Sequence, residues 1–421
     1  MALFSRILTN LAQQCKHVHP VKSVRPIVTS ARRELDISGI YPPIATPFRA
    51  DESIDYGKLE ENINKWNQIP FRGYVVQGSN GEYAYLTKNE RVELVSKVAA
   101  MVPKDKLIIA GAGCESTRDT IEMTRLMSQA GAKAVLVVTP CFYKGQMTNE
   151  AMIGHFTKLS KKSFTITVPV ILYSVPGNTT IDLAPEVIIA LSKHPNIVGL
   201  KDSGGDVAKL ANLVYKTKGN NFQILAGSAS FLLPAYTVGC VGGVLGLANV
   251  LGHECCKLEN LFKKGKMEEA MLLQQRLVGP NVCVTRRFGV PGLKVAMEWF
   301  GYYGGPTRSP LQPISKETEE IIRQAFKNNG FLEFHGFSPS HILKTIAYLK
   351  VLEFLWTSLF GELLKEEQCQ EILADVENIA AVKMDCILEG IEDKINDDNE
   401  ESKTPPLPCI SCKEAILMCD G

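Results

Sequence analysis

The sequence predicts a closed (β/α)8 barrel, the TIM-barrel fold, with extra helices after the eighth unit. Eight short apolar runs rich in β-branched residues recur at intervals of 19 to 36 residues, each followed by a segment of helical periodicity. Strands joined by helical crossovers are parallel, and eight such units are the number that closes a barrel. The runs begin at Ile40, Tyr74, Leu107, Ala134, Val170, Ile197, Phe222 and Val241.

The helical segments carry start and stop residues. Thr87 and Glu90 have the spacing of a capping box, and they open a helix that Pro103 ends. Residues 117–129 predict a second helix, which Gly131 stops. Residues 252–277 and 314–328 predict further helices that extend the barrel.

A doubly wound parallel sheet is the alternative arrangement, and it predicts a G-x-G-x-x-G motif after the first strand. No such motif is present, because Gly111-Ala-Gly113 is followed by Cys-Glu-Ser without a third glycine. The G-x-x-x-x-G-K-[ST] motif is also missing, so nucleoside triphosphate chemistry has no support.

Composition and charge narrow the function classes. The chain has 421 residues, of which 45% are hydrophobic and 22% charged, as in an ordinary globular protein. The net charge of +1 argues against nucleic-acid binding, and no apolar stretch is long enough to predict a membrane span. This small total averages three segments, with net charges of +5 for residues 1–34, +7 for residues 35–330 and −11 for residues 331–421.

The first 34 residues have the pattern of a mitochondrial transit peptide. They contain six Lys or Arg residues and no acid before Glu34, and their apolar residues near the start lie on one helical face. A disordered basic tail is the alternative. The prediction places the protein in the mitochondrial matrix and starts the mature chain near residues 31–35. The barrel then spans residues 35–250, and residues 251–331 supply its additional helices.

The last 90 residues depart from the repeat. Residues 332–395 predict a helical extension of unknown role, either a hairpin that packs on itself or on the barrel, or a helix for a partner or a membrane surface. The acidic balance disfavours anionic membranes. Residues 396–421 predict a disordered acidic tail with prolines and the pair Cys409 and Cys412, which lacks the second pair of a zinc site. The twelve cysteines are irregularly spaced and predict free thiols.

In a (β/α)8 barrel the catalytic groups come from the carboxyl ends of the strands and the loops just beyond them. Lys201 closes one apolar run, and a lysine buried there is desolvated, which favours the neutral amine that attacks ketones. The alternative is a structural lysine paired with Asp202 or with a more distant carboxylate. Position alone leaves the two alternatives open.

Two other strand ends carry polar candidates. Ser79 and Asn80 lie between glycines, so their backbone and side-chain donors suit an anion such as a carboxylate, although a plain turn has the same composition. Tyr173 is either a core ring or a proton shuttle, and taken alone the core interpretation is favoured. The histidines His155, His194 and His253 are scattered, and no H-E-x-x-H motif occurs, so no metal site is predicted.

Four motifs in register carry a resemblance. The segments GSNGE (78–82), LYSVP (172–176), GLKDSGGD (199–206) and LAGS (225–228) resemble the dihydrodipicolinate synthase/N-acetylneuraminate lyase superfamily of class I aldolases. The resemblance covers about residues 35–331. Within it, IYPPIATPF, FRGYVVQGSNGEY, HPNIVGLKDSGGD and RRFGVPGLKVAMEWFGYYGGP are most similar to mitochondrial members that cleave 4-hydroxy-2-oxoglutarate.

The resemblance implies a role for each of these residues. Lys201 forms the Schiff base with the 2-oxo carbon, and Tyr173 relays protons during cleavage to pyruvate and glyoxylate. Ser79 and Asn80 hold the carboxylate beside the imine, with backbone contact from Gly227. No metal or other cofactor is implied, the assembly is a homotetramer, and the metabolic context is hydroxyproline and glyoxylate breakdown.

Ser203 adds a hypothesis drawn from strand geometry. It lies two residues past Lys201, so an extended backbone turns both side chains to the same face, where Ser203 would meet the far carboxylate. The alternatives for function are another pyruvate aldolase, such as a sialic-acid or sugar-acid lyase, and an inactive member that acts as a binding or regulatory protein.

Two positions depart from the family pattern. The lysine-pathway synthases carry a carboxylate-binding arginine after Tyr-x-Val-Pro, where this chain has Gly177-Asn178-Thr179. This difference argues against synthase activity. The family also places a tyrosine from a neighbouring subunit just after Thr-Pro, where this chain has Phe142 followed by Tyr143.

Overall fold

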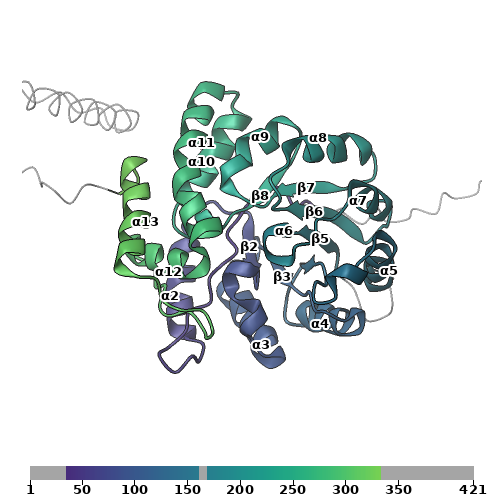
Figure 1. Ribbon diagram of the computed structural model, residues 1–421, viewed down its shortest axis with the longest axis horizontal. Coiled ribbons are helices and arrows are strands. Elements are labelled where there is room, and N and C mark those ends of the chain that lie inside the picture. Colours follow the sequence, from purple (N-terminus) through teal and green to yellow (C-terminus); the bar gives the residue numbers. More distant parts are fainter. Residues whose placement is uncertain (1–34, 161–167, 333–421) are drawn as a thin grey trace, which may run out of the picture. The chain divides into compact units, whose positions relative to one another are not determined.

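The computed structural model describes residues 35–160 and 168–332. Among them, eight parallel strands form one sheet in the order β1-β8-β7-β6-β5-β4-β3-β2, as the sequence predicts for a barrel (Figure 1). The strands are β1 Gly39–Tyr41, β2 Gly73–Val76, β3 Leu107–Gly111, β4 Ala134–Val138, β5 Val170–Ser174, β6 Ile197–Asp202, β7 Gln223–Ala226 and β8 Gly242–Val244.

The barrel closes between its first two strands. Pro43, just beyond β1, forms a parallel bridge with Val75 of β2. The Val75 N–H donates to the Pro42 carbonyl at 3.0 Å, and the Ile44 N–H donates to the Val75 carbonyl at 3.0 Å. These bonds satisfy backbone groups that an open sheet would leave unpaired at its two edges.

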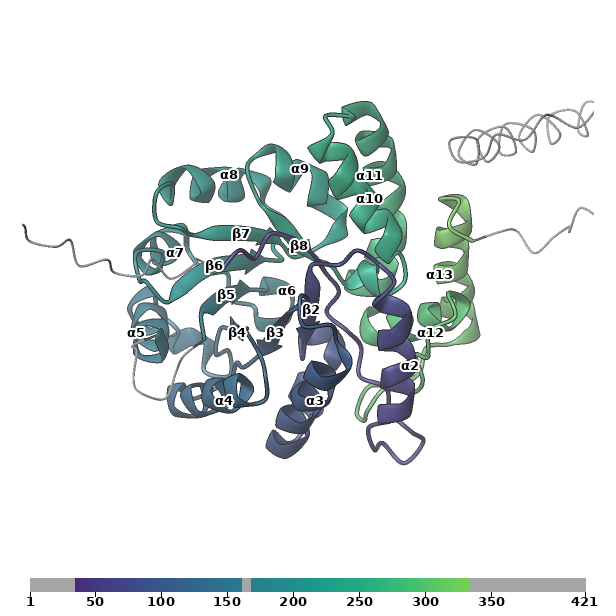
Figure 2. The same cartoon turned by 180° about the vertical axis from the view of Figure 1, so that it is seen from behind.

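Helices surround the strands in both views (Figures 1 and 2), and the late helices α10 to α13 gather on the side where α2 lies. The helices are α2 Tyr56–Trp66, α3 Lys88–Met101, α4 Thr117–Gln129, α5 Asn149–Ser160, α6 Pro176–Thr179, α7 Pro185–Leu191, α8 Val207–Lys216, α9 Leu232–Thr237, α10 Gly252–Lys263, α11 Met267–Val282, α12 Gly289–Trp299 and α13 Lys316–Asn328.

The predicted helix signals are confirmed with two differences. The Thr87–Glu90 capping box forms at the start of α3, and α4 has the expected bounds. The segment predicted over 252–277 divides into α10 and α11, because Gly265 adopts a left-handed conformation with a φ of +73°. Helix α12 was not predicted, since Pro291 and two glycines interrupt its apolar pattern.

Alternation along the strands separates two layers of apolar side chains. Ile171 and Tyr173 of β5 belong to the cluster inside the barrel, whereas Val170 and Leu172 pack outward against the helices. On β6, Leu200 packs outward. The period of two therefore turns the next residue, Lys201, into the barrel. The predicted transit peptide and most of the predicted extension (residues 1–34 and 333–421) lie outside the described residues.

Candidate active site

The sheet register places Tyr173 and Lys201 directly opposite each other. The two residues are Cα partners on the neighbouring strands β5 and β6. The Lys201 Nζ lies 4.0 Å from the centroid of the Tyr173 ring. At this distance an ammonium is attracted by the negative face of the ring. Both side chains stand near the carboxyl ends of their strands, the end at which this fold builds its catalytic sites.

Among the described residues, Lys201 is a buried amine without a carboxylate partner. Only 3% of its surface is exposed, and no ion pair joins it to an acidic side chain in residues 35–160 and 168–332. Its neighbour Asp202 pairs instead with Lys209 of α8, at 3.0 Å. The structural alternative, a Lys201–Asp202 pair, is therefore wrong.

Lys209 organises a charge cluster behind the two strand ends. Its Nζ contacts Asp202 at 3.0 Å and Asp182 at 2.5 Å, and the Ser174 hydroxyl donates to Asp182 at 2.7 Å. Ser174 follows Tyr173 and Asp202 follows Lys201 in the sequence. The cluster thus holds the residues next to Tyr173 and Lys201, which makes Lys209 a positioning residue.

The phenol of Tyr173 is tuned by its neighbours. Burial acts to raise the pKa of Tyr173, but the positive charge of Lys201 and hydrogen bonds with Ser79, Lys201 and Ser203 outweigh it, so the pKa is lowered. The Ser79 hydroxyl lies 3.4 Å from the phenol oxygen. A phenol held this way gives up its proton more readily than an ordinary tyrosine.

Ser79 and Asn80 come from the 3₁₀ turn η2 (Ser79–Gly81), which follows β2. Both are part-buried. Asn80 lies close to the loop after β8, because a Cβ added to Gly246 would come within 3.3 Å of its Oδ1. The turn therefore places one hydroxyl beside Tyr173 and one carboxamide beside the loop after β8.

Gly227 and Ser203 meet at the ends of β7 and β6. The Ser203 hydroxyl lies 3.4 Å from the Gly227 carbonyl, to which it donates, and the Gly227 N–H donates to the Asp202 carbonyl at 2.7 Å. A Cβ on Gly227 would lie 2.0 Å from the Ser203 Oγ, so only glycine fits there. Lys201, Tyr173, Ser79, Ser203 and Gly227 form one continuous set of contacts, with Asn80 at its edge.

Comparison with known proteins shows which family has this arrangement. The model of the dihydrodipicolinate synthetase family matches residues 36–329, about 70% of the chain. The chain belongs to the dihydrodipicolinate synthetase family. This match covers the whole barrel, the helices that follow it and every candidate site residue.

The relatives include enzymes of two kinds. A 4-hydroxy-tetrahydrodipicolinate synthase from Methanoculleus marisnigri is 31% identical over 69% of this chain and 99% of its own length. A probable mitochondrial 4-hydroxy-2-oxoglutarate aldolase from Emericella nidulans is 31% identical over 70% of this chain and 96% of its own. The Acinetobacter baumannii dihydrodipicolinate synthase, solved with pyruvate, is 26% identical and superposes with a TM-score of 0.66 over 70% of this chain and all of its own. The family is thus one of synthases and aldolases.

Phe142 and Tyr143, where the resemblance implies a tyrosine from a neighbouring subunit, are exposed in this chain. Phe142 and Tyr143 are 75% and 72% exposed, and their rings meet edge to face. The Glu115 carboxylate accepts the N–H groups of Cys141 and Phe142, at 3.0 and 2.9 Å, and so holds the loop. Neither ring packs into the barrel of its own chain.

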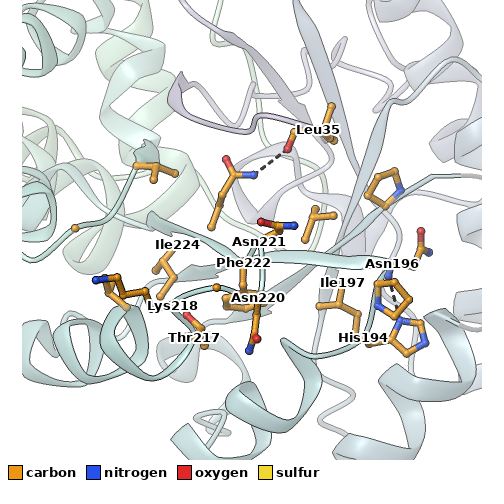
Figure 3. Close-up of a pocket in the computed structure, with 18 of the residues that line it drawn as sticks. Leu35, His194, Asn196, Ile197, Thr217, Lys218, Asn220, Asn221, Phe222 and Ile224 are labelled. Carbon is orange, nitrogen blue, oxygen red and sulfur yellow. Dashed lines mark hydrogen bonds between the residues drawn. The ribbon is translucent and has the colours of Figure 1, made fainter. Parts of the chain in front are cut away.

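A hollow of about 950 Å³ lies at the end of the barrel opposite to the candidate site (Figure 3). Its lining includes Ile197 and Ile224 at the amino ends of their strands, and Leu35, whose carbonyl accepts a hydrogen bond from Gln223 at 2.8 Å. In this fold the amino-terminal end contributes to stability rather than to catalysis. The candidate site therefore stays at the carboxyl ends of the strands.

The described residues contain neither a cluster of metal ligands nor a helix that could span a membrane. Within residues 35–160 and 168–332, no three His, Cys, Asp or Glu side chains converge as metal ligands. None of the helices in this part of the chain is long and apolar enough to cross a bilayer.

Sequence reasoning missed three features that support the site. Lys209 looked like one lysine among many on helix faces, and only its burial against two aspartates distinguishes it. Glu82 belongs to the motif GSNGE, but its partner Lys294 lies 212 residues away. Arg286 reaches the Gly204 carbonyl from the segment between α11 and α12. Lys294 and Arg286 lie 212 and 82 residues from their partners, so no local pattern could have paired them.

Proposed function

We propose that the protein is a class I aldolase that cleaves 4-hydroxy-2-oxoglutarate to pyruvate and glyoxylate through a Schiff base on Lys201. The observation that carries the proposal is the buried Lys201 amine, free of any carboxylate partner in the described residues and 4.0 Å from the Tyr173 ring. The similarity to the Emericella nidulans aldolase supports this choice of substrate.

The proposed reaction follows from these two side chains. The Lys201 amine attacks C2 of the substrate, Tyr173 gives its phenolic proton to the departing oxygen, and water leaves, which forms a protonated imine and a tyrosinate. The Tyr173 tyrosinate takes the proton of the C4 hydroxyl, the C3–C4 bond breaks, and its electrons pass into the imine as an enamine. Glyoxylate leaves, Tyr173 returns the proton to C3, and hydrolysis of the imine releases pyruvate and restores the lysine and the phenol.

The remaining candidates bind the substrate in this proposal. Ser79 and Asn80 hold the carboxylate next to the imine, and Gly227 contributes backbone contact. Ser203 faces the far part of the substrate, which agrees with its contact with Gly227 at the barrel mouth. The lysine performs the covalent chemistry, so the proposed reaction needs no metal or other cofactor.

Synthase activity is the competing possibility, because relatives of that name match equally well. The segment after β5 speaks against it. Residues 177–179 carry no cation, and nothing in the described structure lies within 4 Å of a Cβ built on Gly177. The side chain that would clamp a carboxylate from this position is absent.

We further propose a homotetramer in the mitochondrial matrix. The exposed Phe142 and Tyr143 rings are placed to contact a neighbouring chain. The basic residues 1–34 serve as the mitochondrial targeting sequence. Sedimentation of the full chain tests the assembly. Microscopy of the tagged full chain, compared with a chain that lacks residues 1–34, tests the address.

Borohydride trapping tests the chemistry. The full chain is incubated with pyruvate, reduced, and mapped by peptide mass spectrometry, with Lys201→Ala as the control. We expect an adduct on Lys201 and none in the variant. Release of glyoxylate from 4-hydroxy-2-oxoglutarate then tests the substrate.

Each alternative has its own outcome. An adduct on Lys201 with release of products from N-acetylneuraminate or a sugar acid, and no glyoxylate release, would replace the substrate and keep the mechanism. A folded protein that forms no adduct would contradict the enzymatic proposal and favour a binding or regulatory role.

A further inference from the structure

A π-helical turn joins α11 to α12 beside the site. This turn, η7 (Cys283–Arg287), inserts an extra residue into the helical path, an irregularity that is rare and is frequent at functional sites. Its Thr285 packs at the loop after β8, because a Cβ on Gly246 would lie 3.0 Å from the Thr285 Cγ2 and 3.3 Å from the Asn80 Oδ1. The π turn is therefore next to the predicted carboxylate-binding residues.

Arg286 extends from this turn to the far side of the mouth. Its Nη2 donates to the Gly204 carbonyl at 3.3 Å, and a Cβ on Gly205 would lie 3.3 Å from the same atom. Gly204 directly follows Ser203. The Arg286 guanidinium thus contacts the residue that directly follows Ser203, the side chain predicted to meet the far end of the substrate.

The guanidinium has unused binding capacity. Arg286 is exposed and forms no ion pair with an acidic side chain in the described part of the chain. A guanidinium has five N–H donors, and the contact with Gly204 is the one hydrogen bond found for Arg286 among these residues. The remaining donors are available to a carboxylate, whose two oxygens match the guanidinium fork.

A dicarboxylate substrate needs such a group. At the site, Ser79, Asn80 and Ser203 are neutral donors, and Lys201 is consumed in the imine. Residues 177–179 after β5 provide no cation. The two residues from Lys201 to Ser203 span about 6.6 Å of extended chain. A five-carbon diacid joined to Lys201 as an imine can therefore extend its second carboxylate to the region just beyond Ser203.

We infer that Arg286 binds the carboxylate at the end of the substrate remote from the imine, and that it makes the site selective for 2-oxo diacids. This inference rests on the proposed Schiff-base function and deepens it. Arg286 replaces, from the α11–α12 junction, the cation that residues 177–179 lack.

The test compares two 2-oxo acids that compete with pyruvate for trapping on Lys201. The two compounds differ only at the end remote from the 2-oxo group. 2-Oxoglutarate carries the second carboxylate, and 2-oxopentanoate has a methyl group in its place. We expect the wild-type chain to bind 2-oxoglutarate more tightly. Arg286→Gln should weaken the binding of 2-oxoglutarate about 10- to 100-fold, since a charge-assisted bidentate contact is lost. The same variant should weaken the binding of 2-oxopentanoate by less than about threefold.

Arg287→Gln is the matched control. Arg287 lies on the same turn, but its guanidinium is 4.8 Å from the Phe288 ring centroid, so its loss should leave both competitors unchanged. Arg286→Lys keeps the charge without the fork and should be intermediate. Pyruvate, which has no far carboxylate, reports whether Lys201 still reacts in each variant.

Other outcomes overturn the inference. Three results would each show that Arg286 does not bind the far carboxylate. They are equal loss of affinity for both competitors in Arg286→Gln, no loss for either, and the same loss in Arg287→Gln. A wild-type chain that prefers 2-oxoglutarate and yet releases no glyoxylate from 4-hydroxy-2-oxoglutarate would count against the proposed function alone.

Discussion

Glu82 and Lys294 form an ion pair at 2.7 Å in which both side chains are almost completely buried. Glu82 ends the motif that carries Ser79 and Asn80, and it adopts a left-handed conformation with a φ of 55°. Its other carboxylate oxygen accepts the Arg308 N–H at 2.9 Å. Burial lowers the pKa of Lys294, while Glu82 acts in the opposite direction. The pair therefore ties the carboxylate-binding turn to helix α12.

Removal of Lys294 should destabilise the protein strongly. Lys294→Met leaves the Glu82 carboxylate buried without a cation, which lowers the free energy of unfolding by about 3–5 kcal/mol. Urea denaturation measures the loss, and the double variant Glu82→Gln/Lys294→Met should recover part of it. Lys316→Met, at a pair whose lysine is 93% exposed, serves as the control and should change stability by less than about 1 kcal/mol. Equal effects in the two lysine variants would contradict this view.

Tyr173→Phe should separate imine formation from bond cleavage. The Tyr173 tyrosinate is the proposed proton acceptor, so kcat should fall about 10²- to 10⁴-fold, while pyruvate is still trapped on Lys201, because solvent can supply the proton that imine formation needs. Tyr83→Phe is the control, because burial raises the pKa of Tyr83 to about 12 and leaves it an unreactive neutral phenol. An absorbance titration of tyrosinate should show one group of lowered pKa in the wild type that Tyr173→Phe lacks. Loss of trapping together with cleavage would assign Tyr173 a different role.

Gly227→Ala should disturb the ends of β6 and β7. The added Cβ would lie 2.0 Å from the Ser203 Oγ and 2.6 Å from the Asp202 carbonyl oxygen. We expect a loss of about 1–3 kcal/mol in stability from overpacking, together with a lower kcat/KM. Gly154→Ala in α5, where nothing lies within 4 Å, should be neutral or stabilise by up to about 1 kcal/mol. A Gly227→Ala enzyme with unchanged kinetics would show that Ser203 is free to move.

His155 should make stability depend on pH in the acid range. Burial lowers its pKa from 6.5 to about 4, partly opposed by Glu115. The unfolded chain binds a proton on this residue below about pH 6.5 and the folded chain only below about pH 4, so stability falls as the pH drops through this window, by at most about 3 kcal/mol.

His155→Asn preserves a hydrogen-bonding group toward Thr117, whose hydroxyl lies 2.9 Å from the His155 Nδ1. The variant should lose less stability than the wild type between pH 6.5 and pH 4. Denaturant midpoints at several pH values measure this difference. Parallel pH curves for the two proteins would assign the acid sensitivity to other groups.

Local signals were sufficient for the elements of the barrel. Each strand is a short apolar run bounded by turn residues, and the Thr87–Glu90 capping box predicts where its helix begins. Both patterns can be recognised from the sequence because they depend only on neighbouring residues in the chain. Helix α12 escaped prediction since glycines and Pro291 obscure its period. The position of Lys201 at a strand end could also be predicted, but not that Asp202 pairs with Lys209 and leaves Lys201 without a carboxylate partner in the described residues.

Sequence alone determined the eight-unit repeat, the family motifs and the strand-end positions of Lys201, Tyr173 and Ser79. Periodicity and motifs are local properties of the chain, so they can be recognised without the three-dimensional structure. Only the tertiary structure decided that Asp202 pairs with Lys209, that Glu82 is held by Lys294, and that Arg286 reaches Gly204. The physical reason is that an ion pair or a hydrogen bond depends on distances of a few ångströms between residues, and closing the barrel sets these distances for segments up to 212 residues apart.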